Sequence, residues 1–354
     1  MKVYRFDLRL SLSGIYFLLL LIFLPNSFVF GENFKPVVGP IENTSVEAAH
    51  REYGTEWWYF TGHLEDINQR KFGFELTFFR VGLRKKQLST WEAQSLVVAH
   101  FALSDEQNNL FLFSEEKDRE SFDLAGASNE SLNVWLKDWS AVRSENKILL
   151  KAKDSEKSIE LSFESKKPIV FHGDRGFSKK GAEPGEASIY TSLTRLEGGG
   201  LVTIGEQQFK VKKASAWMDH EFFTSSDKKG AKSWDWFALQ LSNNEEIMLY
   251  QLKHSDGEVT KFSSGTLVKS DGSYLPLTDF KIETLATWKS PKSGISYPSK
   301  WRIKALNYDL TVSPTIANQE ITGSKTTGVN YWEGRSIVSG SHSGEGYVEL
   351  VGYR

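Results

Sequence analysis

The chain has 354 residues, with 43 basic and 45 acidic side chains, a formal net charge of −2 and a pI near 6.4. This balance leaves no basic footprint for a phosphate backbone, so we expect no nucleic-acid partner. The chain contains no cysteine, which excludes a disulfide framework, a thiol nucleophile and a cysteine zinc site. Aromatic residues make up 13% of the chain, with 11 Trp. In a β-rich protein they either fill cores or line a cavity for an apolar molecule.

Residues 1–31 have the features of a secretory signal peptide. Basic residues precede an apolar run over 15–24, and Gly31 offers a small residue at a cleavage site. The run is about half of the roughly 20 apolar residues that a bilayer span requires, so an uncleaved membrane anchor is the less favoured alternative. We therefore expect an exported protein, periplasmic or secreted, with a membrane-associated or export-system partner. The sequence leaves its oligomeric state open.

The remaining chain shows the apolar–polar alternation that is typical of antiparallel strands, separated by turn clusters rich in Gly, Asn, Asp and Ser. Alternating segments occur at 72–78, 160–163, 247–252 and 347–351. The best helical candidate is the segment at 91–99, and 173–185 is expected to be a long loop that acts as a lid or linker. The pattern predicts an all-β protein of barrel or sandwich type.

An internal repeat is visible in the aromatic segments. The opening segment WWYFTGHL at 57–64 aligns with WDWFALQL at 234–241. The closing segments also correspond, with 190–195 and 216–219 matching 331–335 and 346–350. Two copies of one β unit explain a mature length that exceeds what a single core usually organises. We predict domains over 45–222 and 223–354, with a linker through 225–232.

Ionisable groups lie among large aromatic rings at 217–222 (WMDHEF) and at 234–237 (WDWF). Because Asp, His and Glu cost free energy to bury unless paired, this mixture indicates a pocket lined by both kinds of residue. The structural alternative is that Asp219 and His220 satisfy each other beneath an aromatic core. In a regular strand, however, Asp219 and His220 point to opposite faces.

The same alternation argues against a metal triad of consecutive Asp, His and Glu residues. Convergence of His100, His220 and a carboxylate from different strands remains an alternative. A lone histidine such as His100 in an apolar strand is more often a satisfied core residue. We predict no metal site.

Several motifs along the chain occur together and in a fixed order. They are Glu56–Tyr59, Tyr190–Arg195, Trp217–Glu221, Trp234–Phe237, Tyr297 and Pro298 with Trp301, Gln319–Glu320, and Tyr331–Gly334. This set resembles the AttH-like predicted secreted hydrolases, which belong with the carotenoid 1,2-hydratases, from about Tyr53 to the C-terminus. The resemblance implies two tandem lipocalin-like antiparallel β-barrel domains. It also implies a relation to carotenoid and kievitone hydratases, which add water to an isolated alkene of a prenyl group.

Hydration of an alkene needs an acid that protonates one carbon, a surface that tolerates the resulting cation, and a base for the incoming water. Asp219 or His220 is the candidate acid, and Tyr250 is a second possible proton donor. At the position of Tyr250-Gln251-Leu252, the resemblance implies a Tyr-x-Asp motif in carotenoid hydratases. This chain has Leu252 in place of that Asp, so one carboxylate is missing here. Asp235 and Glu221 are candidate substitutes, and no cofactor is required.

We predict an exported protein that binds a small apolar ligand, isoprenoid or lipid-like, and adds water to it by acid–base catalysis. The alternatives are a carrier without enzymatic activity and a hydrolase of a lipid ester. A Gly-x-Ser-x-Gly elbow is absent from the sequence, so Ser-His-Asp catalysis is not indicated. The candidate catalytic residues are Asp219, His220, Tyr250 and Asp235. The candidate ligand-binding residues are Glu56, Trp57, Trp58, Tyr59, Trp217, Glu221, Phe222, Trp234 and Trp236.

Overall fold

The regular structure of the chain is entirely β in a computed structural model that describes residues 34–41, 46–83, 93–121, 123–224 and 233–354. Within these residues there is no α-helix, and hence no helix that could cross a membrane. The expected signal peptide at 1–31 and the expected linker at 225–232 lie outside the described residues. The all-β prediction is confirmed.

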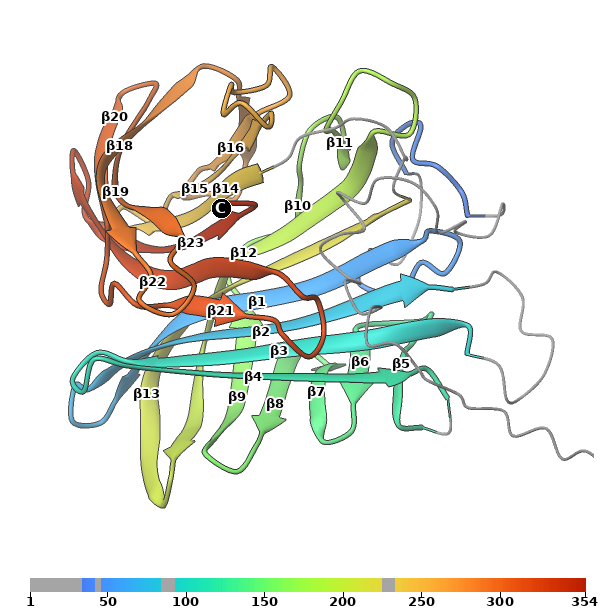
Figure 1. Ribbon diagram of the computed structural model, residues 1–354, viewed down its shortest axis with the longest axis vertical. Helices are drawn as coiled ribbons and strands as arrows, with labels where there is room; N and C mark the ends of the chain where they lie inside the picture. Colours follow the sequence, from blue (N-terminus) through green and yellow to red (C-terminus); the bar gives the residue numbers. More distant parts are fainter. Residues whose placement is uncertain (1–33, 42–45, 84–92, 122, 225–232) are drawn as a thin grey trace, which may run out of the picture.

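The first part of the chain forms one large antiparallel sheet, sheet A, in the order β4-β3-β2-β1-β13-β12-β9-β8-β7-β6-β5, with β10 and β11 paired to β12. Its strands are β1 (Thr55–Asp66), β2 (Lys71–Gly82), β3 (Ser95–Asp105), β4 (Leu110–Arg119), β5 (Ala125–Ala127), β6 (Asn133–Leu136), β7 (Trp139–Ser144), β8 (Lys147–Lys153), β9 (Lys157–Ser165), β10 (Val170–Phe171), β11 (Phe177–Lys179), β12 (Ala187–Ile204) and β13 (Gln207–Phe223). The sheet curls until β6 contacts β3 and β4, which makes a nearly closed barrel (Figure 1).

The second part forms sheet B, an open half-barrel in the order β17-β16-β15-β14-β23-β22-β20-β19-β18, with β21 paired to β22. Its strands are β14 (Ser233–Leu241), β15 (Glu246–Lys253), β16 (Ser264–Val268), β17 (Tyr274–Leu277), β18 (Phe280–Lys289), β19 (Ser296–Ala305), β20 (Tyr308–Pro314), β21 (Glu320–Thr322), β22 (Asn330–Gly340) and β23 (Gly344–Val351). Together the two sheets fit two lipocalin-like barrels.

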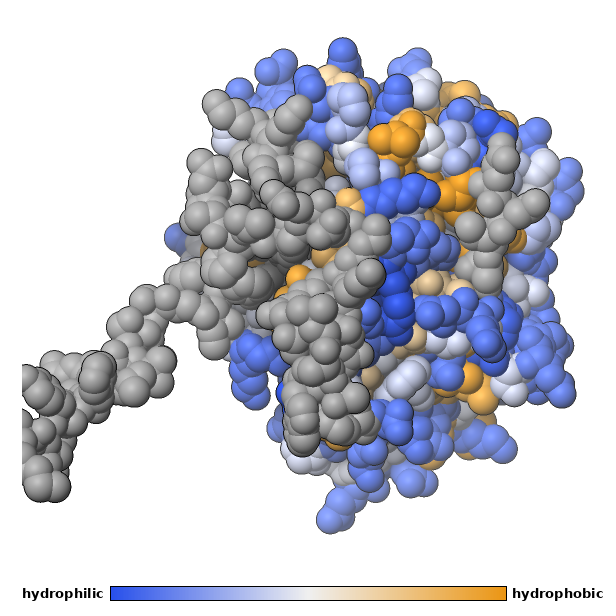
Figure 2. Space-filling view, turned by 90° about the vertical axis from the view of Figure 1, so that its right-hand side faces the viewer, coloured by the Kyte–Doolittle hydropathy of each residue, from blue (hydrophilic) through white to orange (hydrophobic). Residues whose placement is uncertain are grey.

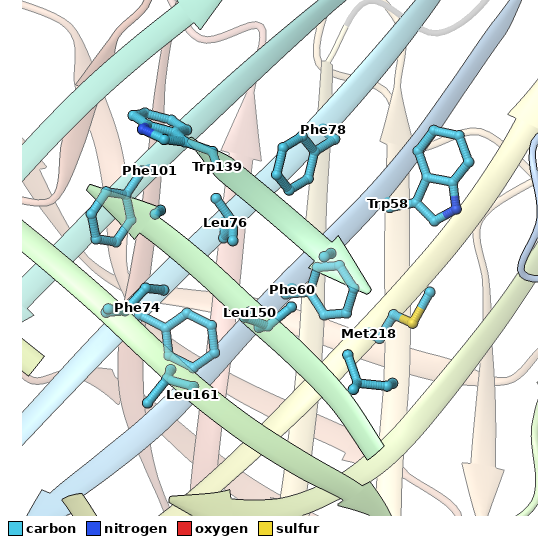
Figure 3. Close-up of a cluster of buried hydrophobic side chains, with 14 of the residues drawn as sticks. Trp58, Phe60, Phe74, Leu76, Phe78, Phe101, Trp139, Leu150, Leu161 and Met218 are labelled. Carbon is cyan, nitrogen blue, oxygen red and sulfur yellow. The ribbon is translucent and has the colours of Figure 1, made fainter. Parts of the chain in front are cut away.

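Each sheet encloses its own apolar core, because alternate residues of its strands point inward. In sheet A, Trp58 and Phe60 of β1 and Met218 of β13 join rings and aliphatic side chains from the other strands (Figure 3). In sheet B, Phe237 and Leu239 of β14 face inward in the same way. The opposite faces of β1, β13 and β14 are therefore turned toward the region between the two sheets.

The paired strands carry the sequence repeat in one register. In sheet A, Tyr59 of β1 lies opposite Asp219 of β13, and in sheet B, Trp236 of β14 lies opposite Glu349 of β23. In the repeat alignment, Tyr59 is equivalent to Trp236, and Asp219 is equivalent to Glu349. The neighbouring strands agree, because Ser192 of β12 lies opposite Asp219 and Glu333 of β22 lies opposite Glu349. Asp219 and Glu349 thus occupy equivalent places in two related sheets.

The helical prediction for 91–99 is wrong for its described residues, because Ser95 begins strand β3. Its apolar residues alternate between the core of sheet A and the face toward sheet B, so both sides of the strand are covered and the period-two signal is weak. Within the expected loop at 173–185, β11 pairs with β12 in place of an unstructured connection.

Sheet B packs against the outer face of sheet A, with contacts between β1 and β23, β2 and β22, and β12 and β14. Polar side chains join the sheets at their edge, since Glu246 of β15 accepts from Arg195 at 2.5 Å and pairs with Lys167 at 2.8 Å. Elsewhere the visible surface is mostly hydrophilic, with hydrophobic residues in separate small patches (Figure 2).

Candidate functional site

The aromatic residues singled out in the sequence gather mainly between the two sheets. This cluster, here called the inter-sheet face, consists of Tyr59, Tyr190, Trp217, Trp236, Ala238, Met248, Tyr250, Leu252 and Tyr347, with Trp57, Trp234 and Phe262 packed against it. It draws on β1, β12, β13, β14, β15 and β23, so neither sheet forms it alone. Strand alternation places the side chains of Asp219 and Glu221 on the same side of β13 as Trp217.

Three donors hold the buried carboxylate of Asp219. Tyr190 Oη donates to Oδ2 at 2.5 Å, Trp217 Nε1 donates to Oδ1 at 2.6 Å, and the hydroxyl of Ser192 also donates to Oδ1. From sheet B, Trp236 Nε1 donates to Tyr190 Oη at 2.9 Å. Burial raises the pKa of Asp219 and the three donors lower it, with the result that the pKa is about 7. This carboxyl can exchange a proton near neutral pH.

Ser192 is part of a hydrogen-bond chain that reaches sheet B. His172 Nε2 lies 2.6 Å from Ser192 Oγ, and His172 Nδ1 lies 2.8 Å from Thr266 Oγ1. Burial lowers the pKa of His172 to about 3, so its ring is neutral. Because Ser192 donates to Asp219, it accepts from His172. A serine nucleophile needs the opposite polarity, since its histidine must accept the serine proton.

Tyr250 reaches the inter-sheet face from β15. Its hydroxyl lies 2.9 Å from Ser178 Oγ, and the ammonium of Lys180 lies 3.9 Å from the centre of its ring. Lys180 also pairs with Glu221 at 3.3 Å. The structure therefore brings two further candidates, Tyr250 and Glu221, to the same face as Asp219. His172, Ser178 and Lys180 come from the segment between β10 and β12, which covers this end of the face.

The structure separates His220 from Asp219. The ring of His220 points into sheet A, stacks on Trp58 with 4.9 Å between the ring centres, and bonds Glu56 Oε1 at 2.9 Å. Its Nδ1 lies 2.5 Å from the carbonyl oxygen of Val46. The ring of Phe222 points to this side too, stacked on His50 at 3.8 Å. Strand alternation thus sends His220 to the face opposite Asp219, as expected from the sequence, and these two catalytic candidates do not share one site.

Glu56 is the centre of a buried ionic cluster at this end of sheet A. It accepts from Arg80 Nε at 2.8 Å and from the backbone amide of His50 at 3.0 Å. Burial acts to raise the pKa of Glu56, but Arg80, His220 and His50 outweigh it and hold the pKa far below its usual range. Arg80 also donates to the carbonyl oxygens of His50 and Tyr53. These hydrogen bonds hold the segment before β1, which contains His50 and Tyr53, against sheet A.

The side chains of His50, Glu56 and His220 are close enough to act as metal ligands, with all three ligand atoms within 4.8 Å of one another. The charges argue against an ion, because Glu56 is the only carboxylate of the group and Arg80 already neutralises it. A divalent cation would leave an uncompensated charge in a buried place. His100 does not join this group, since its two ring nitrogens lie 2.7 Å from Tyr331 Oη and 2.9 Å from Thr326 Oγ1.

Asp235 points into sheet B, away from the inter-sheet face. Its carboxylate accepts from Lys253 Nζ at 2.6 Å and from Tyr353 Oη at 2.5 Å. Trp236, the next residue, points the other way and joins the inter-sheet face. Of the catalytic candidates, the structure thus brings Asp219 and Tyr250 together, and it places His220 and Asp235 in the interiors of different sheets.

A second group of carboxyls lies beside the inter-sheet face and was not among the sequence candidates. Glu75 of β2 and Glu333 of β22 are buried, whereas Glu349 of β23 keeps partial exposure. Glu333 accepts from Tyr59 Oη, and Glu75 accepts from the hydroxyl of Thr77. Burial first, and then the neighbouring negative charges, raise the pKa of all three groups. The sequence carried a signal for two of them, because the repeat aligns Glu349 with Asp219 and Glu333 lies in the Tyr331–Gly334 motif.

The fold and this site define a class of all-β protein with two lipocalin-like sheets and a shared acidic, aromatic face between them. The chain belongs to the AttH-like family, whose sequence profile matches residues 42–353. Among curated proteins, none matches the chain in sequence.

Solved structures of the same fold span nearly the whole chain. One, assigned as AttH from Nitrosomonas europaea, is 27% identical with a TM-score of 0.83, covering 91% of this chain and 100% of that chain. Kievitone hydratase from Nectria haematococca is 16% identical with a TM-score of 0.68, covering 90% of this chain and 96% of that chain. CghA with Sch210972 is 12% identical with a TM-score of 0.59, covering 91% and 95%. The last two likenesses concern the fold alone.

Proposed function

We propose that this protein binds an apolar isoprenoid or lipid-like molecule at the inter-sheet face and adds water to one of its isolated carbon–carbon double bonds. The observation that carries the proposal is Asp219, a buried carboxyl with a pKa of about 7 among aromatic rings. Protonation of a trisubstituted alkene produces a tertiary cation. The faces of Trp217 and Trp236 attract such a cation, and the carboxylate of Asp219 accepts a proton from the attacking water.

Two observations, one on this chain and one on a structural neighbour, favour hydration over ester hydrolysis. Ser192 is oriented as a donor to Asp219, which does not suit a nucleophile. The structurally similar kievitone hydratase is a hydratase by name. We propose separately that the protein is exported. N-terminal sequencing of the protein purified from the cell envelope and from the medium tests this proposal.

A carrier without activity is the second candidate, because the same aromatic face would hold an apolar ligand without any chemistry. The test is incubation with a panel of prenylated lipids and lipid esters in ¹⁸O-labelled water, followed by mass spectrometry. A hydratase adds one labelled water without cleavage, and Asp219→Asn abolishes this product. Cleavage with label in the acid fragment identifies a hydrolase. Recovery of bound, unaltered lipid identifies a carrier.

A further inference from the structure

Hydration requires a proton donor as well as a base, and the three donors on Asp219 favour its anionic form. We propose that Glu349 is the catalytic acid, which delivers a proton to the alkene carbon, and that Glu333 and Glu75 keep it protonated. This inference rests on the proposed hydratase function and names a further catalytic residue for it. It stands on strand register, burial and unpartnered polar atoms.

Strand register forces two carboxyls together. Glu333 and Glu349 lie directly opposite each other on β22 and β23, so their side chains point to the same side. Like charges in such a pair are destabilising, and the pair gains stability when a proton is shared. Glu75 adds a third carboxyl from sheet A, and its negative charge acts on Glu333. At least one of these groups therefore holds a proton at neutral pH.

No cation in the described part of the chain is committed to this cluster. The groups that face it from the packed strands are Asp219 and Glu221 on β13, Glu75 on β2, Tyr59 on β1, Glu333 and Tyr331 on β22, and Tyr347 on β23. Burial of Glu349 and the neighbouring charges outweigh the hydrogen bond from Trp234 on β14, which lowers the pKa of Glu349. Lys180 is committed to Glu221 at 3.3 Å. Lys157 attracts Glu75 weakly but bonds Asp154 at 2.6 Å. Arg335 acts on Tyr347 but bonds Glu345 at 2.8 Å. Because no cation neutralises these carboxylates, they become neutral by binding a proton.

Unpartnered polar atoms point to an occupant of this cluster. Glu75 Oε2 and Thr61 Oγ1 are buried and have no hydrogen-bond partner, and Thr61 lies opposite Glu75 in the pairing of β1 and β2. His63, two residues along the same face, also has an unpartnered Nδ1. Buried polar groups in proteins are nearly always paired. In the proposed reaction, these atoms form hydrogen bonds with the water molecule that attacks the cation.

Access singles out Glu349 among the three carboxyls. Glu75 is 0% exposed and Glu333 is 1% exposed, whereas Glu349 is partly exposed. It lies opposite Trp236 in the pairing of β14 and β23, and the charge of Asp219 acts on it. Glu349 therefore borders the aromatic rings that would face the cation, on the side equivalent to Asp219.

The proton balance closes with these two groups. The O–H bond of Glu349 breaks and a C–H bond forms at one alkene carbon, which leaves the tertiary cation at the other. Water forms a C–O bond with this cation and transfers a proton to Asp219. The net reaction is alkene plus water to alcohol, and solvent returns the proton from Asp219 to Glu349.

The first experiment needs no substrate. Infrared difference spectra of the whole protein should contain the carbonyl band of protonated carboxyls at neutral pH, and the part due to Glu349 should be lost as the pH rises through about 8. Glu349→Gln should reduce this band. Glu164→Gln, which removes an exposed carboxyl paired with Lys166 at 3.5 Å, should leave it unchanged. A band that is absent, or identical in wild type and Glu349→Gln, overturns the inference.

The second experiment uses whichever alkene the labelled-water assay identifies. Glu349→Gln should lower kcat by about 10²–10⁴-fold, with Glu349→Asp recovering part of the loss because it keeps an acid. In wild type the hydration rate should fall at high pH as Glu349 loses its proton, and Glu349→Gln should not show this fall. If wild type hydrates no substrate, the proposed function fails while the infrared result still stands. If wild type hydrates and Glu349→Gln does so equally fast, the inference fails alone.

Removal of a charge from a repelling group should not unfold the protein, and a melting curve checks this. Should Glu349→Gln not fold, Glu349→Asp carries the test, because its shorter side chain moves the proton away from the substrate. A wild-type rate in this variant would then contradict the inference.

Discussion

Two buried carboxyls on adjacent strands, Glu56 on β1 and Asp219 on β13, have opposite pKa shifts. Glu56 faces Arg80 inside sheet A, and this cation outweighs the cost of burial. Asp219 has only neutral hydrogen-bond donors on the other side, so burial, with the negative charge of Glu221, dominates and the pKa rises to about 7. The partner, rather than burial alone, decides whether a carboxyl becomes a fixed charge or a proton-exchanging group.

The hydroxyl of Tyr190 should control the proton affinity of Asp219. Tyr190→Phe removes one donor to the carboxylate, and a hydrogen bond to a charged group contributes about 1.5–3 kcal/mol. We expect the pKa of Asp219 to rise by about 1–2 units, and the pH profile of hydration to move with it. Ser178→Ala, which removes only a partner of Tyr250, is the control. An unchanged profile in Tyr190→Phe would argue against Asp219 as the group that exchanges the proton.

Glu56 should matter for stability. Glu56→Gln leaves Arg80 buried without its carboxylate, and breaking such a pair costs about 3–5 kcal/mol of unfolding free energy. Urea unfolding measures this loss. Glu164→Gln breaks an exposed pair and should cost less than about 1 kcal/mol. Equal stability of Glu56→Gln and wild type would mean that the cluster does not fasten the segment before β1.

At the scale of the element, β12 links the barrel of sheet A to the inter-sheet face. Its first half pairs with β10 and β11, and from Leu196 onward it pairs with β9. Register shifts against β13 occur between Leu193 and Leu196 and between Gly198 and Gly200. Such bulges bend a strand. The bend lets one strand carry Tyr190 and Ser192 to the site and still complete the barrel.

Gly200 is the residue that this bend requires. Its φ is +151°, and a Cβ there would lie 2.1 Å from the carbonyl oxygen of Glu160. Gly200→Ala should therefore lower the unfolding free energy by about 1–3 kcal/mol. Gly205, at φ +58° in the following turn with open space around it, is the comparison, and Gly205→Ala should cost less. Equal losses in chemical denaturation of the two variants would show that the close approach to β9 is unimportant.

At the scale of the whole molecule, the packing of sheet B on sheet A buries carboxyls that neither sheet would bury alone. Glu75 and Asp219 come from sheet A, and Glu333 and Glu349 from sheet B. The unfolded chain would ionise these groups near pKa 3.8–4.5, whereas the folded protein keeps protons on Asp219 up to about 7 and on Glu349 up to about 8. Stability must therefore depend on pH in a defined direction.

Raised carboxyl pKa values mean that the folded state binds more protons than the unfolded state, so stability falls as the pH rises through this window. Buried histidines act oppositely, since the pKa of His100 falls from 6.5 to about 3, but their effect ends above about 6.5. Between about 6.5 and 8 we expect the unfolding free energy to fall by about 1.4 kcal/mol per pH unit for each excess proton. Urea unfolding across this range measures it, and Glu349→Gln should flatten the slope. A rise in stability with pH would contradict the assignment.

Much of the site was visible in the sequence as residue types, and less of it as an arrangement. The motif at 217–222 predicted Asp219 among aromatic rings, and strand alternation already placed His220 on the other face. Glu333 and Glu349 lie in the repeat segments, but an acidic residue in a strand is usually exposed to solvent. The sequence therefore did not mark them as buried carboxyls. Strand pairing within sheet B sets them opposite each other, and packing against sheet A adds Glu75 and Asp219 as neighbours that raise their pKa.

The sequence by itself determined the β class, the repeat and the family, because these depend on local alternation and on motif order along the chain. Tertiary structure decided which face of each strand meets the second sheet. That choice paired Asp219 with Tyr190, which in turn accepts from Trp236, and Asp235 with Lys253, although both acids lie within two residues of a Trp in the sequence. The reason is physical: a carboxyl's proton affinity depends on charges and donors within a few ångströms, and those come from strands distant in sequence.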